Sequence, residues 1–218
     1  MLEIRGKRFE VREGTLDAFI VHENAGRQYA RLQLQSSDIA LDVGANIGAF
    51  SVLHADQVNR IIAVEPEPEN LALLRCNTEL NDCGNVTIVP RFVTGAPVDF
   101  SVKLYLNVRQ NRGAHSAYIR RGRPSIDVAT VTLDHLIETY HPTVAKIDVE
   151  GAEYEMLLHT DYLSELRELV FEWHSSVLRD GTHERYRYLI QHLQRYFEHV
   201  EYVEDIGKRW TAVVYCRQ

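Results

Sequence analysis

The middle of the chain alternates short apolar runs, rich in β-branched residues, with stretches of helical character. The apolar runs cover residues 38–43, 60–65, 85–89, 142–148 and 166–173. The helical stretches cover residues 48–57, 68–80, 152–160 and 184–197. Strands that alternate with helices over short connections predict right-handed crossovers and a parallel sheet with helices on both faces.

The C-terminal residues depart from this alternation. Residues 199–203 and 210–216 are two apolar-rich runs on either side of a turn-like segment. They predict a closing hairpin, which places one antiparallel strand in an otherwise parallel sheet. Because 218 residues fit a single domain, we expect residues 1–218 to form one domain, with its α/β core over residues 36–218.

Two segments stand outside the regular core. Residues 1–35 predict a β-rich N-terminal extension. The strand positions expected there are Ile4, Phe9 and Val11. Residues 100–132 are an insertion that begins with alternating apolar and polar residues and ends in a return strand. Between these strands, residues 109–123 hold five arginines and no acid, and an excursion of this length is usually functional or disordered.

Composition excludes several classes of protein. The hydrophobic fraction of 45% and charged fraction of 25% are those of ordinary globular domains, not of collagen-like, disordered or coiled-coil chains. No apolar run reaches the ~18 residues of a membrane span, and the first residues do not resemble a signal peptide, so we expect a cytoplasmic protein without membrane contact. The three cysteines form no CxxC pair, which predicts neither disulfides nor a zinc site.

Residues with chemical potential follow the first two predicted strands. The first strand ends in Asp42, and the turn 44–48 after it is made of small residues that let the backbone approach a ligand. Asn46 replaces the second glycine of a dinucleotide-binding turn, so Gly-x-Gly-x-x-Gly is absent. The second strand ends in Glu65, at about the ~20-residue interval where a βαβ unit delivers an acid to a ribose diol. An ordinary turn and a solvated acid are the alternatives.

The fourth and fifth predicted strands end in further polar residues. Lys146, Asp148 and Glu150 alternate, so they share one side if the extended geometry persists. Polar residues on a strand that is buried on both faces cost desolvation energy, which indicates a site. The fifth strand ends in Glu172 and His174. Since ligands of an open parallel sheet bind beyond the carboxyl ends of its strands, we expect all five residues at one edge.

These motifs together resemble the FkbM-type family of S-adenosylmethionine-dependent methyltransferases. The matching motifs are DVGANIG at 42–48, EP at 65–66, Asn77 with Asn81, KIDVEGAE at 146–153, and Glu172 with His174. The resemblance covers about residues 38–175. It implies an α/β, class I methyltransferase (Rossmann-like) fold: a mostly parallel seven-stranded sheet with an antiparallel last strand and helices on both faces.

The resemblance also implies a reaction and a cofactor. The reaction is O-methylation of a hydroxyl of a small molecule, sugar or natural product, with S-adenosyl-L-methionine as donor and S-adenosyl-L-homocysteine as product. The implied cofactor-binding residues are Asp42, Gly44, Ala45, Asn46, Gly48, Glu65, Pro66 and Asp148. Residues 91–94 fall where the family contacts adenine.

A hydroxyl is a poor nucleophile until its proton leaves, so we expect a base near the methyl group. The candidate catalytic residues are Asp148, Glu150, Glu172, His174 and Lys146. Two carboxylates and a histidine can also hold a divalent metal ion. The cofactor edge already accounts for these polar groups, so we expect no metal.

The arginine-rich segment predicts either a solvated loop or a lid over an anionic substrate, because guanidinium groups match carboxylate and phosphate geometry. The candidate substrate-binding residues are His115, Ser116, Arg120 and Arg121. The expected partner is a carboxylated, phosphorylated or nucleotide-linked small molecule or glycan. The net charge of -7 disfavours nucleic acid, and no oligomeric state is specified.

Two other functions compete with methyl transfer. An NAD(P)-binding oxidoreductase is disfavoured by the missing second glycine. A catalytically silent module that binds partners would have no chemical need of Asp42, Gly44, Glu65, Asp148 and Glu150 together. A methyltransferase is therefore the leading hypothesis.

Overall fold

The fold is built on a seven-stranded sheet with the strand order β11–β12–β10–β9–β3–β4–β5. The computed structural model describes residues 1–26, 28–96, 101–108, 110–112, 114–117, 120, 122–174, 182–204 and 211–218. The strands of this sheet are β3 (Ile39–Val43), β4 (Arg60–Val64), β5 (Val86–Val89), β9 (Val144–Ile147), β10 (Glu168–His174), β11 (His199–Glu204) and β12 (Thr211–Arg217). Neighbours from β10 to β5 run parallel, and β12 is antiparallel to both β10 and β11. The predicted sheet, with its antiparallel last strand, is confirmed.

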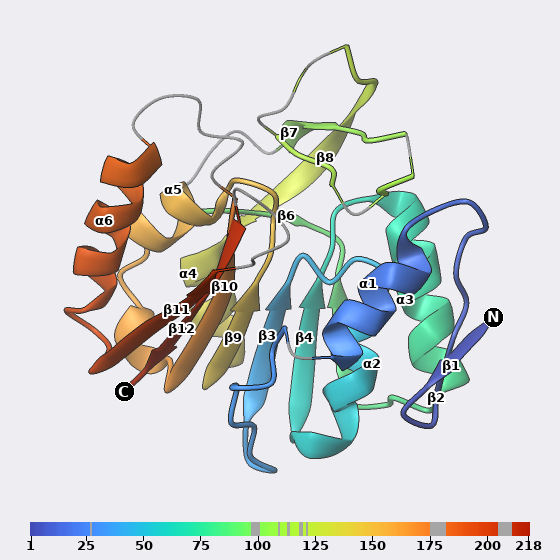
Figure 1. Cartoon of the computed structure of the whole chain (residues 1–218), viewed down its shortest axis with the longest axis horizontal. Coiled ribbons are helices and arrows are strands. Elements are labelled where there is room, and N and C mark those ends of the chain that lie inside the picture. The colour runs from blue at the N-terminus through green and yellow to red at the C-terminus, as the bar shows by residue number, and fades with distance from the viewer. Residues whose placement is uncertain are drawn as a thin grey trace.

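Helices cover both faces of the sheet (Figure 1). They are α1 (Asp17–Ala25), α2 (Ala49–His54), α3 (Pro68–Leu80), α4 (Leu133–Tyr140), α5 (Glu153–Leu158) and α6 (Thr182–Leu193), with short 3₁₀ turns η1 (Ala55–Gln57) and η2 (Leu163–Glu165). Successive strand residues point to opposite faces. Leu41 and Val43 therefore pack with apolar residues of α4, α5 and α6, whereas Ala40 packs with those of α1 and α2. Among the described residues, no helix is both long and apolar enough to cross a bilayer.

The predicted helix 68–80 coincides with α3, because its start carries clear signals. Pro68 occupies the first helical position and the side chain of Glu67 accepts the backbone N–H of Asn70. Neither α1 nor α4 was predicted. The residue before α1 is Leu16, which offers no side-chain cap, so its start has no sequence signal.

The N-terminal extension contains less β structure than the sequence predicts. Strands β1 (Leu2–Ile4) and β2 (Lys7–Phe9) form an antiparallel hairpin. The expectation is correct for this hairpin, but Val11 lies beyond β2 and is not in a strand. The extension then forms α1, which is its longest regular element.

The insertion carries its predicted return strand. Strands β6 (Phe92–Thr94), β8 (Ser125–Thr132) and β7 (Ser101–Tyr105) form a second sheet in the order β6–β8–β7, and β7 and β8 are antiparallel. In Figure 1, β7 and β8 lie above the arrowheads of β3, β4 and β9. The chain between them returns through two backbone hydrogen bonds between Tyr105 and Ser116. The insertion therefore stands over the carboxyl edge of the main sheet.

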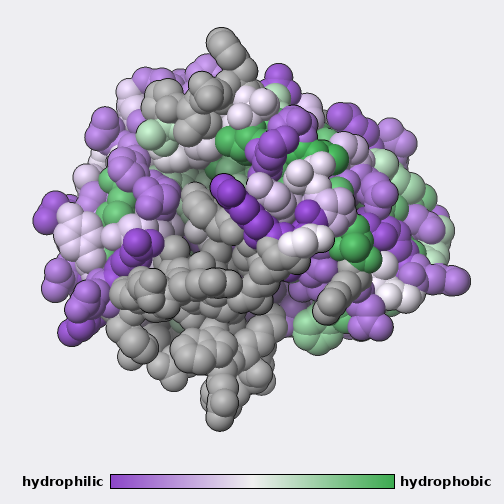
Figure 2. Space-filling view, turned by 90° about the horizontal axis from the view of Figure 1, so that it is seen from above, coloured by the Kyte–Doolittle hydropathy of each residue, from purple (hydrophilic) through white to green (hydrophobic). Residues whose placement is uncertain are grey.

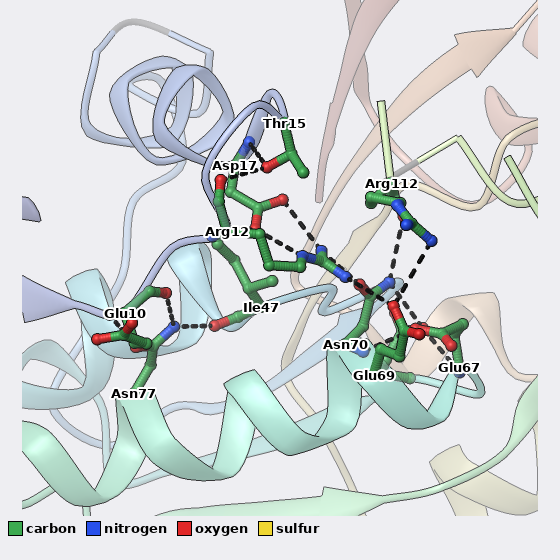
Figure 3. A network of polar contacts seen from close by, with 11 residues as sticks. Glu10, Arg12, Thr15, Asp17, Ile47, Glu67, Glu69, Asn70, Asn77 and Arg112 are labelled. Atoms are coloured by element: carbon green, nitrogen blue, oxygen red, sulfur yellow. Dashed lines mark hydrogen bonds and ion pairs between the residues drawn. The ribbon is translucent and has the colours of Figure 1, made fainter. Parts of the chain in front are cut away.

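A strap of residues 8–17 crosses α3 and is fixed there by asparagine side chains (Figure 3). Asn77 is fully buried; its side chain accepts the N–H of Glu10 at 2.6 Å and donates to the carbonyl of Ile47 at 2.8 Å. Asn81 makes the same kind of exchange with the backbone of Arg8. Two residues of the family motif thus hold the N-terminal strap, and Asn77 also holds the turn before α2.

The strap continues into a second anchor. The guanidinium of Arg12 donates to the carboxylate of Asp17 at 2.8 and 3.0 Å and to the side-chain oxygen of Asn70 at 2.8 Å. Asp17 is fully buried at the start of α1. The same arginine therefore fixes α1 relative to α3 (Figure 3).

A buried ion pair joins the two central strands. Asp42 on β3 lies opposite Lys146 on β9, and their charged groups are 3.0 Å apart. The side chains are 0% and 4% exposed. Ser51 donates to the other oxygen of Asp42 at 2.7 Å, and Lys146 also donates to the carbonyl of Gly44 at 2.8 Å. This pairing explains how polar residues persist in the middle of a covered sheet.

Replacing Asn77 should loosen the strap. We expect Asn77→Ala to lower the free energy of unfolding by about 2–4 kcal/mol, because the buried groups of Glu10 and Ile47 lose their partner. Urea denaturation measures the change, and Glu79→Ala on the exposed face of the same helix is the control. Equal stability of the two variants would contradict this role.

The ion pair should behave as one unit. We expect Lys146→Met to lower the free energy of unfolding by about 3–5 kcal/mol, because it leaves the charge of Asp42 buried alone. The double variant Asp42→Leu with Lys146→Met should lose much less than the sum of the single changes. Additive losses in the double-mutant cycle would show that the two side chains do not interact.

Candidate active site

A cavity of about 290 Å³ opens at the carboxyl ends of β3, β4, β9 and β10. The residues predicted from the sequence that line it are Gly44, Ala45, Asn46, Glu65, Pro66, His115, Lys146, Asp148, Glu150, Glu172 and His174. Residues 91–93, expected near adenine, line it as well. Figure 2 looks down on this side of the molecule, where hydrophilic side chains surround a few apolar ones. The structure thus places most of the predicted site residues around one cavity.

Four predicted residues that the structure describes lie elsewhere, and a fifth falls outside the described residues. Asp42 is buried in its ion pair with Lys146 beneath the cavity, so it does not line the space that a ligand would occupy. Gly48 begins α2 at φ 86°, and a Cβ there would be 2.6 Å from Leu74, so it serves packing. Arg120 lines a neighbouring hollow, Ser116 is buried behind the cavity wall, and Arg121 lies outside the described residues.

The turn after β3 depends on a glycine. Gly44 has φ 77°, and a Cβ on it would be 1.8 Å from the carbonyl oxygen of Asp148. Asn46 follows in the left-handed region at φ 52°, and its N–H donates to Glu65 at 2.9 Å. The side-chain oxygen of Asn46 is buried and has no hydrogen-bond partner among the described residues. The turn therefore offers an acceptor to a ligand in the cavity.

Glu65 is a carboxylate held in place by its neighbours. Its two oxygens accept the N–H groups of Asn46 and Glu67, both at 2.9 Å, and Asn70 lies 3.4 Å away. Only 5% of the residue is exposed. Burial raises the pKa of Glu65 to about 7, although these hydrogen bonds act in the opposite direction. Its charge therefore changes near neutral pH.

His174 lies at the centre of a carboxylate cluster, which we define as Asp148, Glu150, Glu153 and Glu172. Its Nδ1 is 2.7 Å from Glu153, and its Nε2 is 3.8 Å from one oxygen of each of the other three. Burial lowers the pKa of His174, but the charges of Glu153 and Glu150 raise it well above its usual value. The imidazole therefore holds its proton at neutral pH, which leaves proton acceptance to the carboxylates.

Glu153 is a site residue that the sequence reasoning did not single out. Its carboxylate is buried and accepts the N–H groups of Val149 and Gly151, both at 3.2 Å, as well as facing His174. The extended geometry expected beyond Lys146 ends at Ile147, because Glu150 has φ 53° and Gly151 φ 108°. The signal available in the sequence was an acid near the start of the predicted helix 152–160.

The extension also contributes residues that sequence reasoning missed. Ile20, Glu23 and Asn24 of α1 line the cavity, and so does Gln28 just after it. Gln28 donates to the carboxylate of Glu172 at 3.4 Å. These residues were missed because α1 itself was not predicted.

His115 brings the insertion to the cavity. Its Nδ1 accepts the N–H of Asn107 at 2.9 Å, and burial together with the positive charges of Arg12 and Arg112 lowers its pKa to about 4. Its imidazole is therefore neutral at pH 7. The neighbouring Ser116 donates to the carbonyl of Glu150 at 2.9 Å, so it supports the turn after β9.

Arg120 faces a second hollow beside the cavity. Its guanidinium lies 5.7 Å from the ring centre of Tyr105, and Lys103 and His159 line the same hollow. Phe92 and Val93 belong to the walls of both spaces. The hollow is therefore continuous with the cavity wall but distinct from the carboxylate cluster.

Two curated proteins are similar to the chain in sequence. "Hexuronic acid methyltransferase AglP" from Haloferax volcanii is 27% identical over 149 residues, which cover 66% of this chain and 59% of that protein. The chain thus spans little more than half the length of this relative. "Methyltransferase sdnD" from Sordaria araneosa is 28% identical over 195 residues, which cover 69% of this chain and 72% of that protein.

Solved structures share the fold at low sequence identity. A methyltransferase FkbM from Methylobacillus flagellatus matches with a TM-score of 0.53 and 17% identity, over 86% of this chain and 45% of that one. Precorrin-6y C5,15-methyltransferase from Geobacter metallireducens has the same TM-score, with 14% identity over 96% and 95% of the chains. SMU.1697c from Streptococcus mutans, solved in complex with SAH, has a TM-score of 0.52 and 12% identity over 95% and 99%. These matches confirm a class I methyltransferase fold.

A family model described as the methyltransferase FkbM domain matches residues 42–203. This range includes every strand of the main sheet except β12, the start of β3 and the last residue of β11. It also includes the glycine turn, Glu65 and the whole carboxylate cluster. The chain therefore belongs to the FkbM family of methyltransferases.

Proposed function

We propose that this chain transfers a methyl group from S-adenosylmethionine to an oxygen atom of a small molecule or glycan. The observation that carries the proposal is a single cavity that joins the glycine turn and Glu65 with the carboxylates around His174. When bound, S-adenosylmethionine supplies a methyl group on a positively charged sulfur, and the sulfur keeps the bond's electron pair and leaves as a neutral thioether.

The residues of the turn fit this cofactor. Asn46 has a buried side-chain oxygen without a partner among the described residues, and Glu65 has acceptor capacity beyond its bonds to backbone N–H groups. A ribose diol would supply the matching donors. Phe92 and Val93 offer apolar surface to an adenine ring. The solved neighbour with bound SAH supports the same assignment.

The carboxylate cluster would receive the proton of the acceptor hydroxyl. Asp148 and Glu150 are its most exposed members, with side chains 27% and 23% exposed, and both line the cavity. They are the proposed proton acceptors, because His174 is already protonated. The hydroxyl proton passes to one of them as the oxygen forms its bond to the methyl carbon.

We propose that the acceptor is anionic. Its negative group would lie away from the carboxylate cluster, because the carboxylates would repel a negative charge. The hollow that holds Arg120 and Lys103 shares the wall residues Phe92 and Val93 with the cavity. A carboxylate bound there would leave the rest of a sugar ring to reach the cavity. The name of the Haloferax volcanii relative, a hexuronic acid methyltransferase, supports a carboxylated sugar.

Cofactor binding should depend on the charge of Glu65. Because the ionised form accepts both ribose hydroxyls, we expect S-adenosylhomocysteine to bind about tenfold more weakly at pH 6 than at pH 8. Glu65→Gln should bind weakly at both pH values, and Glu69→Gln on the exposed side of α3 should follow the natural chain. Isothermal titration calorimetry measures the affinities. Absence of any binding would refute the proposed cofactor.

The acceptor class is tested by methyl transfer from labelled S-adenosylmethionine to paired acceptors, hexuronic acids and their neutral hexose counterparts, free and nucleotide-linked. We expect transfer to the acids. Arg120→Ala should raise KM about tenfold with kcat unchanged, because Arg120 binds the carboxylate away from the reacting atoms. Arg5→Ala on the N-terminal hairpin is the control. Preference for neutral sugars, or an unchanged KM, would contradict the anionic acceptor.

A further inference from the structure

Helix α1 brings polar side chains to the cavity. Val21 and Ala25 are buried and pack with apolar residues of α2. Asn24 follows Val21 by three residues, which places it on the same side of the helix, and it is only 9% exposed. Asn24 and Glu23 both line the cavity. Because asparagine is seldom buried on the packed side of a helix, its presence there indicates a site.

The side-chain amide of Asn24 is held in one orientation. Its nitrogen donates to the backbone carbonyl of Ile20, one turn earlier in the helix, at 3.0 Å. No donor among the described residues reaches the oxygen of the same amide. Asn24 therefore offers a fixed hydrogen-bond acceptor to a molecule in the cavity.

His115 lines the same cavity from the insertion, and its tautomer is fixed. Burial and the positive charges of Arg12 and Arg112 lower its pKa to about 4, so the ring is neutral at pH 7. Its Nδ1 accepts the backbone N–H of Asn107 at 2.9 Å, so the proton of the neutral ring is on Nε2. Within the described ranges, nothing accepts this proton. His115 therefore offers a fixed hydrogen-bond donor.

The two residues belong to segments that are joined to each other and to the carboxylate cluster. The backbone N–H of Leu16, just before α1, donates to the carbonyl of Gln110 in the insertion at 2.8 Å. Beyond the other end of α1, the side chain of Gln28 donates to Glu172 at 3.4 Å. The fixed donor and the fixed acceptor thus line one cavity with the carboxylates that would receive the proton.

A hydroxyl group suits both side chains, because it can donate a hydrogen bond to one group and accept a hydrogen bond from another. A cationic ammonium group would instead form stronger bonds with the carboxylate cluster, and a carboxylate would do so with an arginine. A site built for hydroxyl groups rejects analogues that lack them, since its polar atoms then have no partners. These neutral side chains are therefore suited to a molecule that carries several hydroxyl groups.

We infer that Asn24 and His115 bind hydroxyl groups of a sugar acceptor, with Asn24 as the hydrogen-bond acceptor and His115 as the donor. The inference rests on the proposed function, and it names the residues that bind the neutral part of the acceptor. Neither residue takes the proton of the reacting hydroxyl. Both therefore determine which sugar is bound and have no part in the chemical step.

The test is isothermal titration calorimetry of the full chain, saturated with S-adenosylhomocysteine, with D-glucuronic acid and D-galacturonic acid. We expect the Kd of the sugar to rise about tenfold in Asn24→Ala and in His115→Asn. An asparagine at 115 can still accept the N–H of Asn107 but lacks the donor at Nε2. The control is His22→Ala on the exposed side of α1, which should bind sugar as the natural chain does.

Singly deoxygenated analogues of the same sugars identify the contact. The analogue that lacks the hydroxyl bound by Asn24 should bind the natural chain about tenfold more weakly than the parent sugar does. Asn24→Ala should bind this analogue and the parent sugar equally, because the partner of the missing hydroxyl is already gone.

The inference would be overturned by unchanged sugar binding in both variants, or by a natural chain that binds neither sugar. Weaker S-adenosylhomocysteine binding in both variants with sugar binding retained would also overturn it, because the residues would then hold the cofactor. Circular dichroism shows whether each variant is folded, and if one is not, the other decides. A chain that binds sugar through these residues but no S-adenosylhomocysteine would refute the proposed methyl transfer and leave the sugar site standing.

Discussion

The site depends on the close approach of two backbone segments. A Cβ on Gly44 would lie 1.8 Å from the carbonyl of Asp148, so only glycine lets the turn after β3 touch the end of β9. Beneath this contact, Lys146 binds both the carboxylate of Asp42 and the carbonyl of Gly44. The turn after β3 and the carboxylate cluster are thereby parts of one wall.

The pKa of each titratable group near the cavity depends on the residues that surround it. His174 is surrounded by carboxylates and keeps its proton, whereas His115, near three arginines, stays neutral. Glu65 lies between these extremes because burial opposes its ionisation while backbone N–H groups favour it. These two histidines and one glutamate therefore have protonation states that the sequence alone does not assign.

Much of the fold was predictable from sequence, and the reasons are local. The parallel strands are continuous apolar runs, and α3 begins with a proline after a capping glutamate. Most of the predicted site residues line the cavity because strand ends of a parallel sheet meet at one edge. Helix α1 has no cap and little amphipathic pattern, so Gln28 after it was not predicted. The role of Glu153 requires a turn that reverses the chain at Glu150 and Gly151.

Strand β10 is longer than its parallel neighbour β9, and this determines which strand supports its last residues. Its pairing with β9 ends at Phe171 opposite Ile147, whereas its pairing with β12 continues to His174 opposite Thr211. Among the described residues, the end of β10 that presents Glu172 and His174 is thus paired with β12 alone. A shift of β12 along β10 would therefore move the imidazole of His174 relative to the rest of the cavity.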